Sequence, residues 1–211
     1  MADDNWYRST SWDEEARREF EKRLGRARAH NRSQYIRIKA ISLASAGELD
    51  GTQLLLERVL VEYGNDQLQA PMARYQLGEL LEQQGGLDEA ENEYRRVIEI
   101  HCETKHRYGL PELRLAELLL RRGSRLAYQD ALAHLIRRLP DMLLTSHRFR
   151  GATAAARMHR ALGNRDEARA YAATALKIAQ EPQPLFPRHP SLDSDWSPDP
   201  ETLSELRALA N

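Results

Sequence analysis

Four glycines recur along this chain of 211 residues at a nearly constant spacing. Gly47, Gly85, Gly123 and Gly163 stand 38, 38 and 40 residues apart. Each follows a stretch whose apolar residues have helical spacing and precedes another such stretch. Glycine ends a helix readily because it adopts the left-handed backbone conformation without a Cβ clash. The spacing therefore predicts four copies of a helix–turn–helix unit and an all-α fold.

The side chains around each glycine repeat as well. Seven positions before the glycine stands a small residue, which lets two helix backbones approach closely: Ala40, Gly78, Ala116 and Ala156. Twelve and thirteen positions after it stands an apolar pair: Val59/Leu60, Val97/Ile98, Leu135/Ile136 and Ala175/Leu176. These pairs continue one apolar stripe along each predicted second helix. We therefore predict helical hairpins that stack side by side.

The second of these units resembles the tetratricopeptide repeat. Residues 70–99 contain the Leu77-Gly78 pair of that family, its turn glycine at Gly85, its small residue at Ala90 and its aromatic residue at Tyr94. The resemblance extends over about residues 33–180. It implies a right-handed α-hairpin solenoid of about four repeats, and a bacterial, cytoplasmic protein.

The other three units match the family less closely. The fourth shows Gly163 to Ala168 at matching spacing, whereas the third has Tyr128 where a small residue is expected. The first unit is the weakest, with Lys39 in the usual Leu position and Thr52 in the usual Ala position. The tryptophan typical of the first helix of the family is absent from all four.

Residues 1–32 are predicted to form an N-terminal cap. Ser11 and Glu14 have the spacing of a capping box, in which each side chain satisfies a free backbone N–H at a helix start. The helix expected from about residue 12 to 29 resembles the second half of a repeat and would cover an otherwise exposed apolar end. Three aromatic side chains either pack against this cap or form a peptide-docking patch, and we favour packing: Trp6, Tyr7 and Trp12.

Residues 181–211 form a separate C-terminal segment. Six prolines between residues 181 and 200 exclude a helix interior there, because each removes an N–H donor. Asp199 as cap and Pro200 as first residue then predict a short helix with leucines at positions 203, 206 and 209. This helix lies either on the last repeat, which we favour, or in the groove of the solenoid.

Charge and cysteine content exclude several protein classes. The net charge is −1, but residues 16–39 carry nine basic side chains against two acidic ones, and residues 105–165 carry thirteen against four. These segments predict either solvated helix faces or one basic surface.

Cys102 is the single cysteine, so no intramolecular disulfide can form. The acidic N-terminus lacks a signal peptide and the apolar runs are too short to span a bilayer, so we expect a cytoplasmic protein.

Motifs for chemistry are scarce. There is no phosphate-binding loop, no nucleophile elbow and no His-Glu-x-x-His sequence. His101, Cys102 and His106 are metal-ligand types, but a structural zinc site needs four ligands and no second pair stands at suitable spacing. His159 occupies an apolar position of the fourth unit, which favours a hydrogen-bonded core histidine. We therefore predict no enzyme, no metal and no cofactor.

The resemblance implies a protein–protein interaction scaffold that holds a peptide or helix of a partner in the concave groove lined by the first helices. Arginines in the last two units favour an acidic or amphipathic partner segment, because guanidinium groups bind carboxylates in a forked geometry. Two alternatives remain: a nucleic-acid-associated or regulatory protein that uses the basic surface, and an enzyme accessory subunit. The side chains of this predicted groove are Arg37, Ile41, Tyr75, Gln76, Glu79, Arg114, Glu117, Arg150, Arg157 and Arg160.

Overall fold

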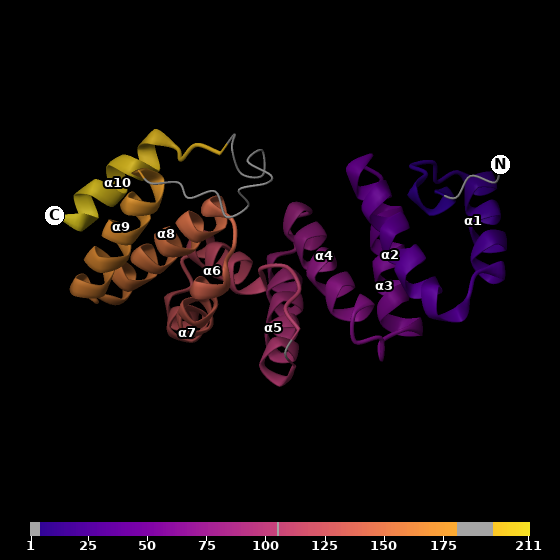
Figure 1. Ribbon diagram of the computed structural model, residues 1–211, viewed down its shortest axis with the longest axis horizontal. Coiled ribbons are helices and arrows are strands. Elements are labelled where there is room, and N and C mark those ends of the chain that lie inside the picture. The colour runs from indigo at the N-terminus through magenta and orange to yellow at the C-terminus, as the bar shows by residue number, and fades with distance from the viewer. Residues whose placement is uncertain (1–4, 105, 181–195) are drawn as a thin grey trace. The chain divides into compact units, whose positions relative to one another are not determined.

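The chain consists of helices in every part that the structure describes. The computed structural model describes residues 5–104, 106–180 and 196–211. These residues form ten α-helices and three short 3-10 turns, and no strand occurs among them (Figure 1). The chain divides into two compact units, Met1–Pro111 and Glu112–Asn211. The prediction of an all-α fold built from helical hairpins is confirmed.

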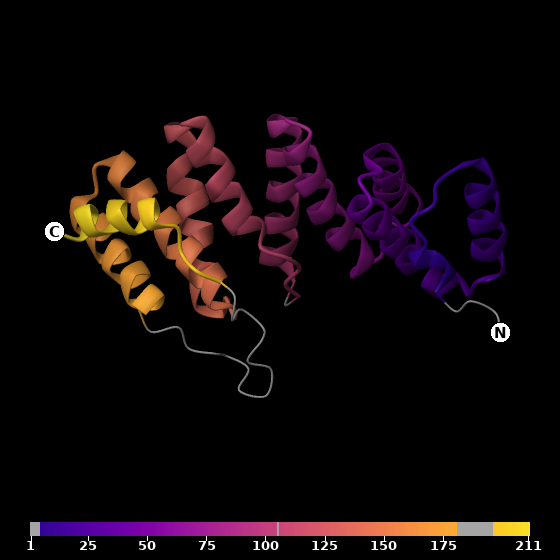
Figure 2. The same ribbon diagram turned by 90° about the horizontal axis from the view of Figure 1, so that it is seen from above.

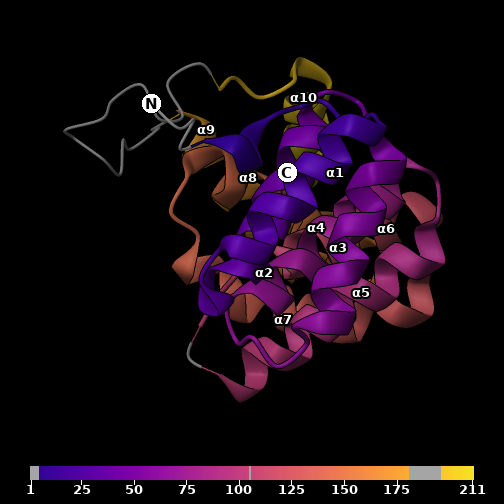
Figure 3. The ribbon, with the colours of Figure 1, turned by 90° about the vertical axis from the view of Figure 1, so that its right-hand side faces the viewer.

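The first unit contains two hairpins and one preceding helix. Its helices are α1 (Glu14–Arg26), α2 (Ala29–Ser45), α3 (Leu49–Glu62), α4 (Gln69–Gln83) and α5 (Leu87–Glu103). Helices α2 and α3 pack as one hairpin, α4 and α5 as the next, and α3 also packs on α4. Helix α1 lies beside the first hairpin (Figure 3), where Phe20 and Leu24 are buried in its core.

The second unit contains two further hairpins and a terminal helix. Its helices are α6 (Pro111–Arg122), α7 (Tyr128–Arg138), α8 (Thr145–Leu162), α9 (Arg165–Gln180) and α10 (Pro200–Ala210). Helix α7 packs on α8, α8 packs on α9 and α9 packs on α10. Helix α10 therefore lies on the last hairpin, as Figure 2 shows and as we expected.

The four glycine turns share one hydrogen-bonded closure. Gly47, Gly85, Gly123 and Gly163 have φ angles of 80°, 84°, 68° and 85°, so all four adopt the left-handed conformation that the spacing predicts. The N–H after each glycine donates to the carbonyl four residues before the glycine, as from Gly86 to Leu81 at 2.9 Å. This bond satisfies a carbonyl that the helix end leaves free.

The small residues of the first helices allow close packing within each hairpin. Ala40, Ala116 and Ala156 are fully buried. At Gly78, an added Cβ would stand 2.7 Å from the ring of Tyr94 on α5. Tyr94 is fully buried, and its hydroxyl donates to the Glu82 carboxylate at 2.7 Å. The repeated small residue therefore has a steric cause in the second hairpin.

The predicted capping box is wrong. Helix α1 starts at Glu14, and its N-cap is Asp13, whose Oδ1 accepts from the Ala16 N–H at 2.8 Å. Ser11 does not cap α1, because it lies two residues before this N-cap, and its carbonyl accepts from the Lys39 ammonium at 3.0 Å instead. A carboxylate one residue before the helix takes the role that the spacing assigned to Ser11.

The aromatic residues of the N-terminus pack against the cap, as predicted. Residues Trp6–Arg8 form a 3-10 turn. The Trp6 ring centroid lies 5.3 Å from that of Phe20, and Tyr7 stacks on Tyr35 at 4.6 Å. Trp12 is buried in the same core. These contacts join the N-terminal segment to α1 and α2.

The C-terminal helix begins as predicted. Asp199 is the N-cap of α10, and its Oδ2 accepts from the Thr202 N–H at 2.8 Å, with Pro200 as first helical residue. The prediction about the prolines of residues 181–195 lies outside the described residues. The boundaries 1–32, 33–180 and 181–211 remain predictions.

Gly85→Ala should lower the free energy of unfolding by about 1 kcal/mol, because a left-handed residue with a Cβ is strained. No atom lies within 4 Å of the added Cβ, so the cost is that of the backbone alone. Gly25→Ala is the matched control, because Gly25 lies within α1 and an added Cβ there also meets nothing within 4 Å. This variant should raise the free energy of unfolding by roughly 0.5–1 kcal/mol. Urea denaturation measures both; equal effects would contradict the turn assignment.

Candidate functional site

The predicted groove begins at Arg37, which the structure buries. Only 7% of Arg37 is exposed. Its Nε donates to Oε1 of Gln69 at 2.6 Å, and its Nη1 lies 3.4 Å from Oε1 of Gln76. Burial lowers the pKa of Arg37, and the nearby charge of Asp66 partly opposes this. Arg37 therefore joins α2 to α4, and little of its surface faces solvent.

Asp66 supports the same junction from the loop before α4. Its Oδ1 accepts from the N–H groups of Leu68 and Gln69, and its Oδ2 accepts from the Ser33 hydroxyl at 2.7 Å. Burial by itself raises the pKa of Asp66, but these hydrogen bonds and the Arg37 charge hold it below its ordinary value. Sequence reasoning missed this residue, although an acid just before a helix is a capping signal.

The predicted side chains of α4 are half-buried. Tyr75 lies against the loop after α5, where an added Cβ at Gly109 would stand 2.7 Å from its ring. Gln76 is joined to Arg37, and Glu79 is half-buried on the same helix. Ile41 of α2 is 40% exposed. Ile41 is thus the most exposed of the predicted groove residues in the first unit.

In the second unit, the structure brings three predicted residues together. Arg150 of α8 binds Glu117 of α6 with a fork: Nε to Oε1 at 2.8 Å and Nη2 to Oε2 at 2.6 Å. Arg114 lies 4.0 Å from the same Glu117 carboxylate. The first helices of the two hairpins are therefore joined by a charged pair with the geometry that arginine prefers.

The last two predicted residues converge on one carboxylate. Arg157 donates through Nε and Nη2 to Oε2 of Glu205 at 3.0 and 2.6 Å. Arg160 reaches Oε1 of the same carboxylate at 3.1 Å. Glu205 comes from α10, and sequence reasoning did not single it out. An acidic side chain between Leu203 and Leu206 of the predicted amphipathic helix was the available sequence signal.

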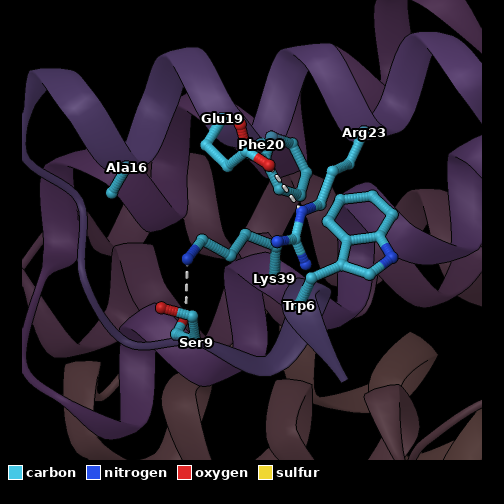
Figure 4. A pocket seen from close by; sticks show the side chains of 7 residues that line it. All are labelled: Trp6, Ser9, Ala16, Glu19, Phe20, Arg23 and Lys39. Carbon is cyan, nitrogen blue, oxygen red and sulfur yellow. Dashed lines mark hydrogen bonds and ion pairs between the residues drawn. The ribbon is translucent and has the colours of Figure 1, made fainter. Parts of the chain in front are cut away.

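A pocket occurs elsewhere in the first unit, between the N-terminal segment, α1 and α2 (Figure 4). Its volume is about 200 Å³, and its lining residues are Trp6, Ser9, Ala16, Glu19, Phe20, Arg23 and Lys39. Glu19 and Arg23, both lining residues from α1, form an ion pair at 2.7 Å. The pocket combines aromatic rings with charged groups.

Lys39 explains the departure of the first hairpin from the repeat pattern. It is 1% exposed, and its Nζ donates to the carbonyls of Ser9 at 2.5 Å and Ser11 at 3.0 Å. The ammonium also lies 5.5 Å from the Trp12 ring centroid. Burial lowers the pKa of Lys39. A lysine at this position holds the N-terminal segment in a way that leucine cannot.

The residues with metal-ligand types do not come together. His101 is buried, and its Nε2 accepts from the Tyr108 N–H at 2.9 Å, so this nitrogen is occupied. Cys102 is exposed. Within residues 5–104, 106–180 and 196–211, no three His, Cys, Asp or Glu side chains are placed to hold a metal ion.

His159 is a core histidine, as its position in the repeat predicts. It is 8% exposed and stacks on Tyr171 with ring centroids 5.4 Å apart. Its Nδ1 lies 3.3 Å from the side-chain nitrogen of Asn164, while Nε2 is buried without a hydrogen-bond partner in the described chain. Burial lowers the pKa of His159, and the charge of Glu167 partly opposes this.

Comparison with known proteins agrees with the geometry. Residues 73–100 match the tetratricopeptide repeat family. Two crystal structures of nearly identical TPR-like repeats, from a protein assigned as a kinesin light chain in Podosopora anserina, share 18% identity with this chain at a TM-score of 0.56. They cover 78% and 80% of this chain, which covers 85% and 88% of them. No curated protein matches the chain.

A third crystal structure is similar over a longer part of the chain. BtubC (BKLC) from P. vanneervenii shares 15% identity at a TM-score of 0.56, over 88% of this chain and 76% of that one. These likenesses establish the fold. Together with the repeat matched at residues 73–100 and the four glycine-closed turns, they show a fold of tetratricopeptide-type helical hairpins. No helix in the described residues combines the length and apolar character needed to cross a membrane.

Lys39→Leu should release the N-terminal segment from α2, because the Ser9 and Ser11 carbonyls lose their donor. Trypsin cleavage after Arg8 should become about tenfold faster, as expected for the loss of one or two hydrogen bonds to a charged group. The control is Lys22→Leu, which removes an exposed lysine of α1. Equal cleavage rates at Arg8 in the two variants would contradict this role.

His159 should make the fold less stable at mildly acidic pH. The pKa of His159 in the folded protein lies below the unfolded value of about 6.5. The neutral side chain therefore contributes fully to the free energy of unfolding above that pH, and this contribution is lost as the pH falls below it. The other three repeats have leucine at this position, namely Leu43, Leu81 and Leu119. His159→Leu should therefore be tolerated and should reduce the loss of stability between pH 7.5 and 5.5. Urea denaturation at both pH values measures this. The same pH dependence in both proteins would refute the assignment.

Proposed function

We propose that this protein is an interaction scaffold that holds a peptide or helix of a protein partner along the predicted groove. The tetratricopeptide fold is typical of such scaffolds and supports the coarse function. Within each compact unit, neighbouring hairpins place their first helices side by side, which offers a surface to a helix or extended segment of a partner. The proposal gives the chain a binding role and no catalytic one.

One observation carries the chemistry of the partner. Arg157 and Arg160, which the repeat register predicts to line the groove, bind a carboxylate that comes from an amphipathic helix. Two guanidinium groups on one carboxylate form a strong, directional contact. This arrangement supports an acidic or amphipathic segment as the partner.

The predicted groove residues would contribute unequally. Arg37 serves the junction of α2 and α4, so its role is to position its neighbours. Arg150 and Glu117 neutralise each other across the two first helices of the second unit. Arg160, whose side chain is 54% exposed, is the best placed of the arginines to meet a partner.

The basic segment of residues 105–165 supports a protein partner better than a nucleic acid. Several of its arginines bind carboxylates within the second unit: Arg138 lies 3.9 Å from buried Glu112, and Arg150 and Arg157 are paired as described. Nucleic-acid binding depends on arginines that are available to neutralise phosphates. Arginines that already bind carboxylates of the second unit are less available to bind phosphates.

Charge reversal at the last hairpin tests the proposal. Arg157→Glu with Arg160→Glu should weaken capture of the native partner by at least tenfold, or about 1.4 kcal/mol. Affinity purification of the tagged full chain from its native cells, with quantitative mass spectrometry, measures this. Arg165→Glu is the control, because Arg165 is an exposed arginine at the start of α9. Undiminished capture by the double variant would discard the groove assignment.

A further inference from the structure

Helix α10 is held on the last hairpin by a polar contact of unusual specificity. Both oxygens of Glu205 are bound, Oε2 by Arg157 and Oε1 by Arg160. The two partners lie one turn apart on α8, and Glu205 lies 48 residues beyond Arg157 in the sequence. The exposed fractions of the Arg157 and Glu205 side chains are 36% and 25%, so the contact is partly shielded from water.

The apolar side of α10 packs on a surface of α8 and α9 that is made mostly of small residues. Leu206 is fully buried, while Leu203 and Leu209 are partly buried against the same cluster. The Trp196 ring, just before α10, lies 5.0 Å from that of Phe149. We define the α10 seat as the two arginines together with the buried side chains that form one apolar cluster with Leu206: Phe149, Ala152, Ala156, Ala172 and Ala175.

The attachment of α10 differs from that of the hairpin helices. Helix α10 has 11 residues, and Leu206 is its single fully buried residue. A helix of this length is marginal when alone in water, so α10 owes its structure to the seat. It is held by the Glu205 carboxylate, by a stripe of leucines, and at its end by the Asn211 carbonyl, which accepts from Arg169 at 3.1 Å. Any helix with the same stripe and carboxylate would make the same contacts.

We propose that the α10 seat is a docking surface for an acidic amphipathic helix of a partner protein, and that α10 is its built-in competitor. This rests on the proposed function and names the partner class: a helix with the pattern Leu-x-Glu-Leu-x-x-Leu, as in residues 203–209. The glutamate binds Arg157 and Arg160, and the leucines cover the alanines of α8 and α9.

Competition follows from the covalent attachment of α10. A tethered ligand acts at an effective concentration of the order of millimolar, so α10 excludes free helices that bind the seat weakly. A partner helix gains access only if it binds better than α10, or if α10 is weakened. Weakening α10 without altering the seat must therefore raise the affinity for a free helix.

A fluorescent peptide of residues 198–211 is the probe, and its binding to the full chain is measured by anisotropy. The wild-type chain should bind it weakly. Glu205→Lys in the chain sets a like charge against the two arginines, releases α10 and should raise the peptide affinity at least tenfold. Glu201→Lys is the matched control, because it makes the same charge change on an exposed residue of α10 and should leave the affinity near that of wild type.

Charge exchange separates recognition of the glutamate from mere opening of the surface. The peptide with Glu205→Arg should not bind the Glu205→Lys chain, but it should bind a chain that carries Arg157→Glu and Arg160→Glu. Circular dichroism of each variant verifies that the hairpins remain folded. Equal peptide affinity of the wild-type and Glu205→Lys chains, or binding that ignores the charge of the peptide, overturns the proposal.

The peptide-binding experiment and the partner-capture experiment can fail independently of each other. If the peptide binds as expected while capture of the native partner ignores Arg157 and Arg160, the seat stands and the proposed function is wrong. If capture depends on the arginines but the Glu205→Lys chain gains no affinity for the peptide, the competition by α10 is wrong.

Discussion

Close contact between the two helices of each hairpin is the constraint on which the rest of the structure depends. A small residue lets the backbones approach, as at Gly78 beneath the Tyr94 ring, and a left-handed glycine reverses the chain within a few residues. The same hydrogen bond closes all four turns. Because each hairpin has this geometry, neighbouring hairpins within a unit can pack in the same way, and their first helices keep one register there.

That register decides where the charged residues meet. Arg150 reaches Glu117 from one first helix to the next, and Arg157 reaches Glu205 on the helix that follows the last hairpin. In each case an arginine of α8 binds the carboxylate of a neighbouring helix. The surface that we propose for partner binding thus uses the interaction that also joins its own elements. An acidic helix of a partner could be bound by the same contact, an arginine of α8 with a carboxylate.

Departures from the repeat pattern have structural causes in the described residues. Lys39, where the family has leucine, donates to two carbonyls of the N-terminal segment and lies over the Trp12 ring. His159, at another leucine position, stacks on Tyr171. Neither set of contacts follows from periodicity, because the two carbonyls that Lys39 binds lie 28 and 30 residues before it and Tyr171 lies on the helix after His159.

The sequence by itself determined the hairpins, their turns and the start of the terminal helix, because glycine turns, helix caps and apolar stripes are local properties. It also predicted that Arg150, Arg157 and Arg160 belong to one groove. The tertiary structure decided what these side chains touch: it buried Arg37 against Gln69, moved the first cap from Ser11 to Asp13, and brought Glu205 to the arginines of α8. Such pairings depend on distances between elements far apart in the chain, which only packing sets.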